Sequence, residues 1–397
     1  MDSVLSDRER LFRDTVAEFA ESRVAPLVAD MDRNAEYDPR LVRDLFAQGL
    51  MGIEVPEAYG GLGAGLLDVV LAIEQLARVD PAIAVLVDVQ NALLAAALVR
   101  YGTGDQKRRF LPTLAGGVVG SFALSEAEAG SDAFAMTTRA EPAPGGYRIH
   151  GEKAWITSAH EAGVFLVCAR TGADARTPAL TMFLVDRDSD GLRIGSRIDK
   201  LGIRASSTCD VTFDGVFVPE ENVLGRAGQG MQIAVEALNI GKLGIAAQLV
   251  GLAEGALGHA LAYAERRAQF GHPIAAFQGV RFPLARLRVE VDAARLTLYQ
   301  TTRALTDGPD DPRQRLRDTA GAKLLASEVA ERVASHALET FGGSGFTTAC
   351  PAEKYYRDAK IGKIYEGTSN VQLRTIAATV FSVPEATEAV STKGTRP

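Results

Sequence analysis

The sequence predicts a mainly α-helical protein with a β domain at its centre. Apolar residues recur at helical spacing at both ends of the chain, whereas the middle consists of short β-branched or aromatic segments separated by turns. At 397 residues the chain exceeds the ~250–300 at which a single core usually stops growing, so several packed units are expected. We expect a helical domain over 1–119, a β domain over 120–228, a second helical domain over 229–383 and a flexible tail over 384–397.

The first helical domain begins with a capping signal. Ser6 followed by Glu9 matches a capping box, in which the side chain of each residue binds the backbone N–H of the other. An apolar stripe at helical spacing follows, formed by Leu11, Phe12, Val16, Phe19 and Ala20. Further helices are expected over 41–49, 65–78 and 82–101, with a glycine-rich turn over 55–61.

The middle of the chain changes to strand character. The expected strands cover 147–150, 164–169, 180–185, 192–195 and 211–218, and turn residues such as Pro144-Gly145-Gly146 separate them. Several short strands at this spacing indicate a small antiparallel sandwich or barrel.

Long helical patterns return after Gly230. They cover 231–267, 278–305, 312–341 and 370–381, and helices of this length pack as an antiparallel bundle.

Bulk properties exclude several classes of protein. The net charge of -7 argues against nonspecific nucleic-acid binding. No apolar run long enough to span a membrane is expected, and a polar first segment, unlike a secretory signal, suggests a cytoplasmic location. Three scattered cysteines and five scattered histidines predict neither a disulfide framework nor a metal site.

Several segments could carry chemistry, although each also has a purely structural interpretation. The segment 122–132 combines small residues and hydroxyls, as a loop that offers backbone amides to a ligand would, but a helix cap and a turn explain it equally. Trp155, the only tryptophan, could be a cofactor platform or a core residue. Polar or capping functions alone would explain 200–208, 265–271 and 339–345.

Glu366 is the least easily explained of these residues. It lies between Tyr365 and Gly367, just before a helix start that Thr368 or Ser369 would cap. An isolated glutamate in a loop is usually solvated, so its position alone leaves both a solvated carboxylate and a catalytic base open.

The joint order of these segments resembles the acyl-CoA dehydrogenase family over nearly the whole chain, from about Ser6 to Phe381. The segments that carry the resemblance are VPEAYGGLG, ALSEAEAGSD, GEKAWITSA, KLGIRASST, ERRAQFG, ETFGGSGF and RDAKIGKIYEGTSN. The resemblance implies a β-barrel or sandwich domain between an N-terminal helical domain and a C-terminal four-helix bundle. It also implies a homotetramer, electron-transferring flavoprotein as a partner and FAD as the cofactor.

The resemblance further implies α,β-dehydrogenation of an acyl thioester, from acyl-CoA to 2-enoyl-CoA. Glu366 would abstract the α-proton while N5 of FAD accepts the β-hydride. In some branches of the family the base lies on a bundle helix, at the position of Gly241 here, which has no side chain.

The implied site residues fall into cofactor and substrate groups. Substrate contacts would come from Ser131, Asn239, Lys242 and Gly367. FAD contacts, some of them across a dimer, would come from Phe122, Leu124, Ser125, Gly130, Ser131, Trp155, Ile156, Thr157, Arg267, Phe270, Gln278, Glu339, Thr340, Phe341, Gly342, Gly343, Thr368, Ser369 and Asn370.

Four positions depart from the family pattern. Asn239 stands where Asp is common, which removes a charge, and Lys242 stands where Arg is common, which removes the planar guanidinium. These two differences keep a carrier-protein thioester open as an alternative substrate. Glu339 replaces a common Gln, and Ser125 a Thr. Two further alternatives are a flavin monooxygenase or oxidase on the same fold, against which Glu366 weighs, and a noncatalytic helical binding protein.

Overall fold

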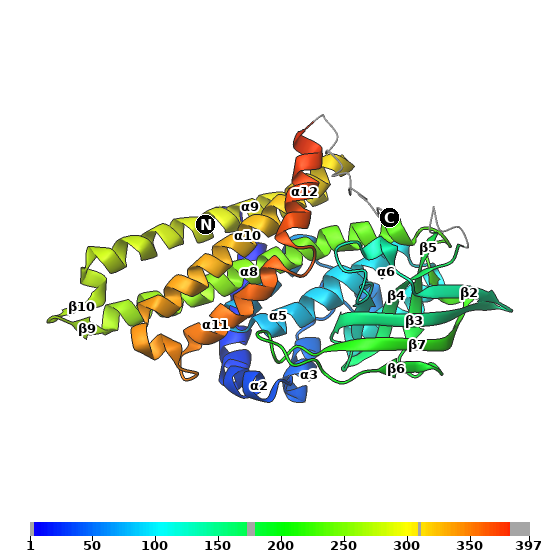
Figure 1. Ribbon diagram of the computed structural model, residues 1–397, viewed down its shortest axis with the longest axis horizontal. Helices are drawn as coiled ribbons and strands as arrows, with labels where there is room; N and C mark the ends of the chain where they lie inside the picture. The colour runs from blue at the N-terminus through cyan, green and yellow to red at the C-terminus, as the bar shows by residue number, and fades with distance from the viewer. Residues whose placement is uncertain (1–3, 173–178, 309–310, 382–397) are drawn as a thin grey trace, which may run out of the picture.

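The computed structural model describes residues 4–172, 179–308 and 311–381, so the expected flexible tail over 384–397 lies outside the described residues. Figure 1 shows the long helix α8 (Gly230–Arg266) spanning much of the molecule. The β domain lies at one end of α8, and a hairpin of β9 (Ala268–Gln269) and β10 (His272–Pro273) lies at the other. The expected order of helical, β and helical domains is confirmed.

The N-terminal domain is helical throughout. Its helices are α1 (Asp7–Phe19), α2 (Val28–Asn34), α3 (Pro39–Ala47), α4 (Leu66–Val79), α5 (Pro81–Asp88), α6 (Ala96–Tyr101) and α7 (Gly104–Gly116), with π-helical turns at Ala20–Val24 and Val89–Ala95. The expected capping box of α1 is confirmed, because Ser6 Oγ accepts from Glu9 N and Glu9 Oε2 accepts from Ser6 N at 2.7 Å.

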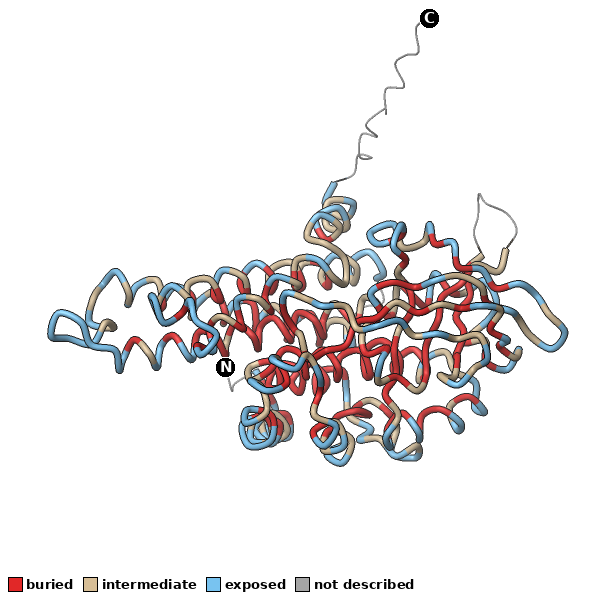
Figure 2. The backbone as a smooth tube through the Cα atoms, turned by 60° about the horizontal axis from the view of Figure 1, so that its bottom comes forward, coloured by how far each residue is buried: buried red, intermediate tan, exposed pale blue. Residues whose placement is uncertain are grey.

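The expectation that no apolar run could span a membrane is corrected. The helical stretches Pro81–Tyr101 and Gly230–Arg266 are long and apolar enough to do so by length and composition alone. Within their most apolar windows, however, 94% and 78% of the residues are buried inside the protein. Figure 2 shows this buried interior running through the centre of the molecule, so both stretches are core helices.

The central domain is one eight-stranded sheet in the order β6-β7-β3-β2-β4-β5-β8, with β1 beside β4. Its strands are β1 (Val119–Ala123), β2 (Arg139–Ala143), β3 (Gly146–Thr157), β4 (Ala162–Arg170), β5 (Leu180–Asp186), β6 (Leu192–Ile194), β7 (Thr208–Pro219) and β8 (Val223–Leu224). All five expected strands are present. The sheet is mixed rather than antiparallel, because β1 runs parallel to β4.

Strand β4 is buried on both faces. Phe165 and Val167 belong to an apolar cluster within the β domain, whereas Leu166 and Cys168 pack into a second cluster shared with the helices. A strand covered on both sides reads as a continuous apolar run, as 164–169 does.

The C-terminal domain packs α8, α9 (Gln278–Asp307), α10 (Pro312–Thr340), α11 (Pro351–Ala359) and α12 (Ser369–Val380). The four long helical patterns are confirmed to within two residues at each boundary, and α11 is an additional short helix. Helix α12 rises from the body of the molecule near the β domain (Figure 1).

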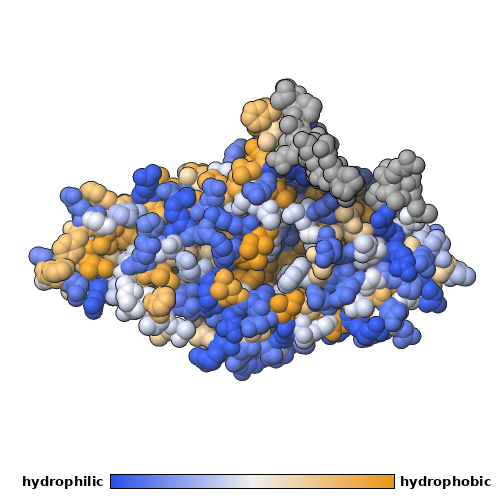
Figure 3. Space-filling view, viewed as in Figure 1, coloured by the Kyte–Doolittle hydropathy of each residue, from blue (hydrophilic) through white to orange (hydrophobic). Residues whose placement is uncertain are grey.

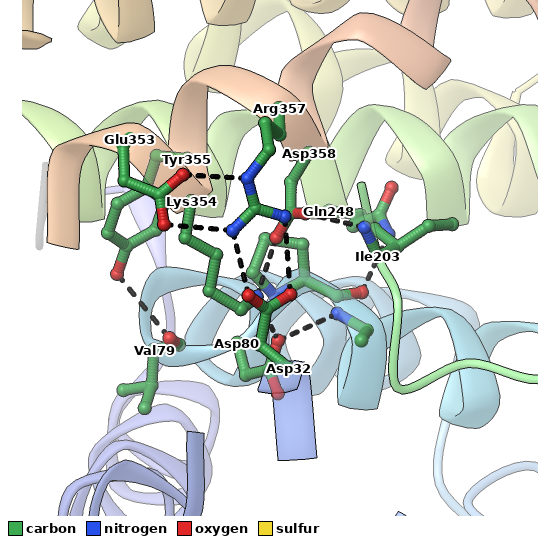
Figure 4. A network of polar contacts seen from close by, with 12 residues as sticks. Asp32, Val79, Asp80, Ile203, Gln248, Glu353, Lys354, Tyr355, Arg357 and Asp358 are labelled. Carbon is green, nitrogen blue, oxygen red and sulfur yellow. Dashed lines mark hydrogen bonds and ion pairs between the residues drawn. The ribbon is translucent and has the colours of Figure 1, made fainter. Parts of the chain in front are cut away.

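A buried cluster of charges joins α11 to the rest of the protein (Figure 4). Lys354 Nζ donates to Asp80 Oδ1 at 2.7 Å and to Asp358 Oδ2 at 2.6 Å, and both aspartates are buried. Asp80 caps α5, and Asp358 also accepts from the backbone N–H of Ile203 in the segment before β7. The cluster therefore holds parts of all three domains together.

Replacing Lys354 by methionine should destabilise the protein strongly. The substitution leaves two buried carboxylates without their cation, which costs about 3–5 kcal/mol. The matched control is Lys360→Met, because Lys360 pairs with Glu331 while 54% of its side chain is exposed, and such pairs contribute about 0–1 kcal/mol. Denaturant midpoints of the two variants measure the difference, and equal midpoints would contradict the structural importance of the cluster.

Candidate active site

Two of the predicted cofactor segments lie side by side in the β domain. Ser121 Oγ, in β1, donates to the carbonyl of Thr157 at the end of β3 at 2.6 Å, and Ala154 N donates to the carbonyl of Ser125 at 2.9 Å. The structure therefore brings 122–125 together with 155–157. In the loop that follows β1, Leu124 is buried, whereas Gly130 and Ser131 are exposed.

The loop after β1 is anchored by a buried ion pair. Lys153 Nζ lies 3.0 Å from Glu126 Oε1 and donates to the carbonyl of Leu124 at 2.8 Å. Burial raises the pKa of Glu126, but hydrogen bonds from Thr138 and Thr137 and the charge of Lys153 outweigh it and hold this pKa at about 2. Glu126 is therefore an ionised structural anchor and not a base.

Trp155 occupies a strained position at a β-bulge. The register between β3 and β7 shifts between Lys153 and Ile156, so β3 has one extra residue there. Trp155 has a left-handed backbone (φ 62°), and the residue is 60% exposed. A large exposed aromatic ring on a strained backbone is typical of a ligand-binding position, so the core interpretation of Trp155 is wrong.

Glu366 also has a left-handed backbone, with φ 51°, which is uncommon outside glycine. Neighbouring helices hold its turn. Gln372 Nε2, on α12, donates to the carbonyls of Glu366 and Gly367 at 2.9 Å each, and Lys323 Nζ, on α10, donates to the carbonyl of Gly367 at 2.8 Å. Thr368 caps α12 by accepting from Val371 N, and Asn370 in its first turn is exposed.

The carboxylate of Glu366 is enclosed, so the solvated interpretation is wrong. Its Oε2 atom is buried and has no hydrogen-bond partner among the described residues. Burial raises the pKa of Glu366 to about 7, and the cations Lys242 and Lys323 limit the rise. Burial also lowers the pKa of Lys323 to about 8. Glu366 can therefore exchange a proton near neutral pH.

Helix α8 makes room for this carboxylate at Gly241. A Cβ atom there would lie 3.1 Å from Glu366 Oε2 and 2.8 Å from a methyl carbon of Leu93. Neither of the residues three positions before and after Gly241 in the sequence is an acid that could rival Glu366. The residue next to Gly241 is Lys242, whose Nζ donates to Asn239 Oδ1 at 3.0 Å. Figure 3 shows apolar side chains around a hollow near the middle of the face, beside the base of α12.

The other predicted cofactor residues gather at the opposite end of the helical domain. Arg267 and Phe270 lie at the β9–β10 hairpin and Gln278 begins α9, while 339–343 end α10. Tyr263 stacks on Phe341 with ring centroids 4.3 Å apart, which brings the two groups together. The side chain of Glu339 lies 3.6 Å from His336. Within one chain the β9–β10 hairpin is remote from β3, the strand that contains Trp155 (Figure 1).

Sequence reasoning missed three buried charged groups of the site, namely Lys153, Lys323 and Asp88. A signal existed for two of them. Lys323 lies between Ala320 and Ala326 on the buried stripe of α10, and Asp88 interrupts an apolar helix. A charged residue on an apolar face is rarely buried unless it has a function or a partner.

Comparison with known proteins identifies one family along the chain. Its N-terminal domain ("Acyl-CoA dehydrogenase, N-terminal domain") matches residues 6–118, its middle domain matches 121–216 and its C-terminal domain matches 228–381. A probable short/branched chain specific acyl-CoA dehydrogenase of Dictyostelium discoideum is 47% identical over 376 residues, covering 94% of this chain and 90% of that protein.

Solved structures agree. Butyryl-CoA dehydrogenase from Megasphaera elsdenii superposes with a TM-score of 0.91 at 36% identity, covering 95% of this chain and 98% of that one. A glutaryl-CoA dehydrogenase from Mycobacterium smegmatis in complex with FADH2 gives 0.89 at 28% identity, covering 96% of both chains.

The pKa of Glu366 should respond to its two cations. Because Lys242 stabilises the ionised carboxylate, Lys242→Met should raise this pKa above about 7, while Lys360→Met on the surface should leave it unchanged. Infrared titration of the carboxyl band, assigned by its loss in Glu366→Gln, measures both values. An unchanged midpoint in Lys242→Met would contradict the described contact.

Proposed function

Because this chain belongs to the acyl-CoA dehydrogenase family, and is thus an FAD-dependent oxidoreductase of acyl-CoA thioesters, we propose that Glu366 is its catalytic base. The observation that carries the proposal is the buried, unpartnered Oε2 of Glu366, whose pKa is raised to about 7. A base is most effective when its pKa lies near the working pH. A carboxylate that has lost its water shell and gained no hydrogen bond is a stronger base than one in solvent.

The backbone of the same residue supports this role. Among the described residues, the N–H of Glu366 donates to no group, although both carbonyls of the turn are bound by Gln372 and Lys323. This N–H can therefore donate to the thioester carbonyl and stabilise the charge that develops on its oxygen when the α-proton leaves. One such donor contributes on the order of 10²–10³ in rate.

The residues of the β domain fit FAD. The exposed ring of Trp155 offers an aromatic face, and the loop after β1 offers backbone amides around Gly130. The space beside Gly130 is open, because a Cβ atom added there would have no other atom within 4 Å. Thr157, Ile156 and Phe122 would hold the ring system from the adjoining strand ends. When bound, FAD supplies the acceptor for the two electrons that leave the substrate.

We propose short or branched acyl-CoA esters as the substrates. The support is the substrate class in the names of the relatives. Lys242 faces Glu366, so it keeps a cation beside the base although Arg is common at this position. The carrier-protein alternative of the sequence analysis therefore has no support from Lys242.

We further propose a cytoplasmic homotetramer that passes its electrons to electron-transferring flavoprotein. The support for the assembly is the exposed group at the end of the bundle remote from Trp155. Phe270 is 92% exposed, and Gln278 is also exposed. Residues that complete the FAD site of a neighbouring subunit would be exposed in this way when a single chain is considered.

Glu366→Gln should retain FAD and the fold but lose anaerobic reduction of the flavin by butyryl-CoA. Removing a general base costs on the order of 10²–10⁴ in rate. The matched control is Glu328→Gln on the exposed side of α10, which should reduce at the normal rate. Stopped-flow absorbance measures both, and unimpaired bleaching in Glu366→Gln would refute the assignment.

Phe270→Asp should dissociate the assembly, because a charge would be buried at the contact without a partner. We expect a smaller mass by analytical ultracentrifugation and weaker FAD retention, with unchanged helical content. An unchanged mass and full FAD content would exclude this residue from the contact.

A further inference from the structure

Asp88 is a second buried carboxyl group beside the proposed base, and nothing in the fold explains it. The residue ends α5 and is 1% exposed. Its Oδ1 atom is buried, and neither carboxyl oxygen takes part in a hydrogen bond or an ion pair among the described residues. The buried aspartates of the fold, in contrast, are paired, as Asp80 and Asp358 are with Lys354. An unpaired buried carboxyl group is costly, so its retention indicates a ligand.

The glycines of α8 place this carboxyl group relative to Glu366. A Cβ atom on Gly244 would lie 1.7 Å from Asp88 Oδ1, just as one on Gly241 would lie 3.1 Å from Glu366 Oε2. Residues three apart share a helix face, and three residues rise about 4.5 Å along the axis. The two carboxyl groups therefore lie over one face of α8, separated by about one helical turn.

This separation fits the length of a short acyl chain. The α-carbon of the substrate must lie beside Glu366, as the proposed function requires. A distance of about 4.5 Å along α8 is spanned by three to four bonds of an extended chain, because each bond of about 1.5 Å advances less than its own length along the zigzag. The group that meets Asp88 is therefore attached at or just beyond the γ-carbon.

The charge state of Asp88 selects the chemistry of that group. Burial and the neighbouring charge of Glu366 raise the pKa of Asp88 well above its ordinary range, which favours the neutral carboxylic acid. A neutral carboxylic acid both donates and accepts a hydrogen bond, and a hydroxyl group matches both functions. A methyl group in the same place would leave the acid unpaired.

We propose that Asp88, seated over Gly244, is a specificity-determining residue that binds a hydroxyl group on the γ-carbon of the acyl chain. The preferred substrates are then short γ-hydroxyacyl-CoA esters. The inference rests on the proposed function, because it assumes that the thioester lies beside Glu366.

Binding to the Glu366→Gln holoenzyme tests the inference without turnover. The probes are freshly prepared γ-hydroxybutyryl-CoA and pentanoyl-CoA, in which a methyl group replaces the hydroxyl group at nearly constant size. We expect γ-hydroxybutyryl-CoA to bind on the order of tenfold or more tightly by calorimetry. Equal Kd values, or tighter binding of pentanoyl-CoA, would overturn the inference.

Three added substitutions separate recognition from shape. Asp88→Leu should reverse the preference, Asp88→Asn should keep it because an amide also donates and accepts, and Gly244→Ala should abolish it by displacing the carboxyl group. An unchanged ratio in Asp88→Leu, or tightest binding of γ-aminobutyryl-CoA, would refute hydroxyl recognition. If Asp88→Leu does not fold, the test of the inference is the ratio of the two Kd values in the enzyme that keeps Asp88, compared with the same ratio in Gly244→Ala. Failure of the proposed function would look different, because the flavin of Glu366→Gln would then still be reduced by butyryl-CoA.

Discussion

The position of the base depends on the buried contact between Lys354 and the two aspartates Asp80 and Asp358. Only the short 3₁₀ segment Lys360–Lys363 and two residues separate α11 from Glu366, so the orientation of α11 sets where the carboxylate lies. The contact with Ile203 ties the same helix to the β domain, which carries Trp155. One charged cluster therefore fixes the relative placement of the proposed base and the proposed cofactor surface, which come from different domains.

The interior carboxyl groups differ in function because they differ in partners. Glu126 has a cation and several N–H donors, so its pKa is about 2 and it remains an ionised anchor. Glu366 has two cations nearby but no hydrogen bond at Oε2, which leaves its pKa at about 7. Asp88 has neither, and burial together with the charge of Glu366 raises its pKa well above the ordinary range. The same chemical group thus serves as an anchor, as a proposed base or as a proposed hydrogen-bond donor, according to what each helix or strand places beside it.

Much of the fold could be predicted from periodicity, because long helices and doubly buried strands leave strong apolar patterns. Strand β2 is not among the expected strands. It contains Pro142, which the sheet tolerates because β2 pairs there only with β3 and needs no second partner. The parallel pairing of β1 is a tertiary feature without a local signal. At the site, the motifs indicated Glu366 and Trp155 but not their strained backbones. The charges that tune Glu366 come from α8 and α10, and only packing reveals that they face it.

Helix α8 shows why small residues can matter as much as charged ones in this site. Gly241 and Gly244 contribute no side chain, but each creates the space that one carboxyl group occupies. Any substitution at Gly244 would collide with Asp88 Oδ1, so the identity of residue 244 limits what residue 88 can be. The same dependence links Gly241 with Glu366. The surface proposed to meet the acyl chain is therefore set by pairs of positions on different helices, and the effect of a substitution at one member of a pair depends on the residue at the other.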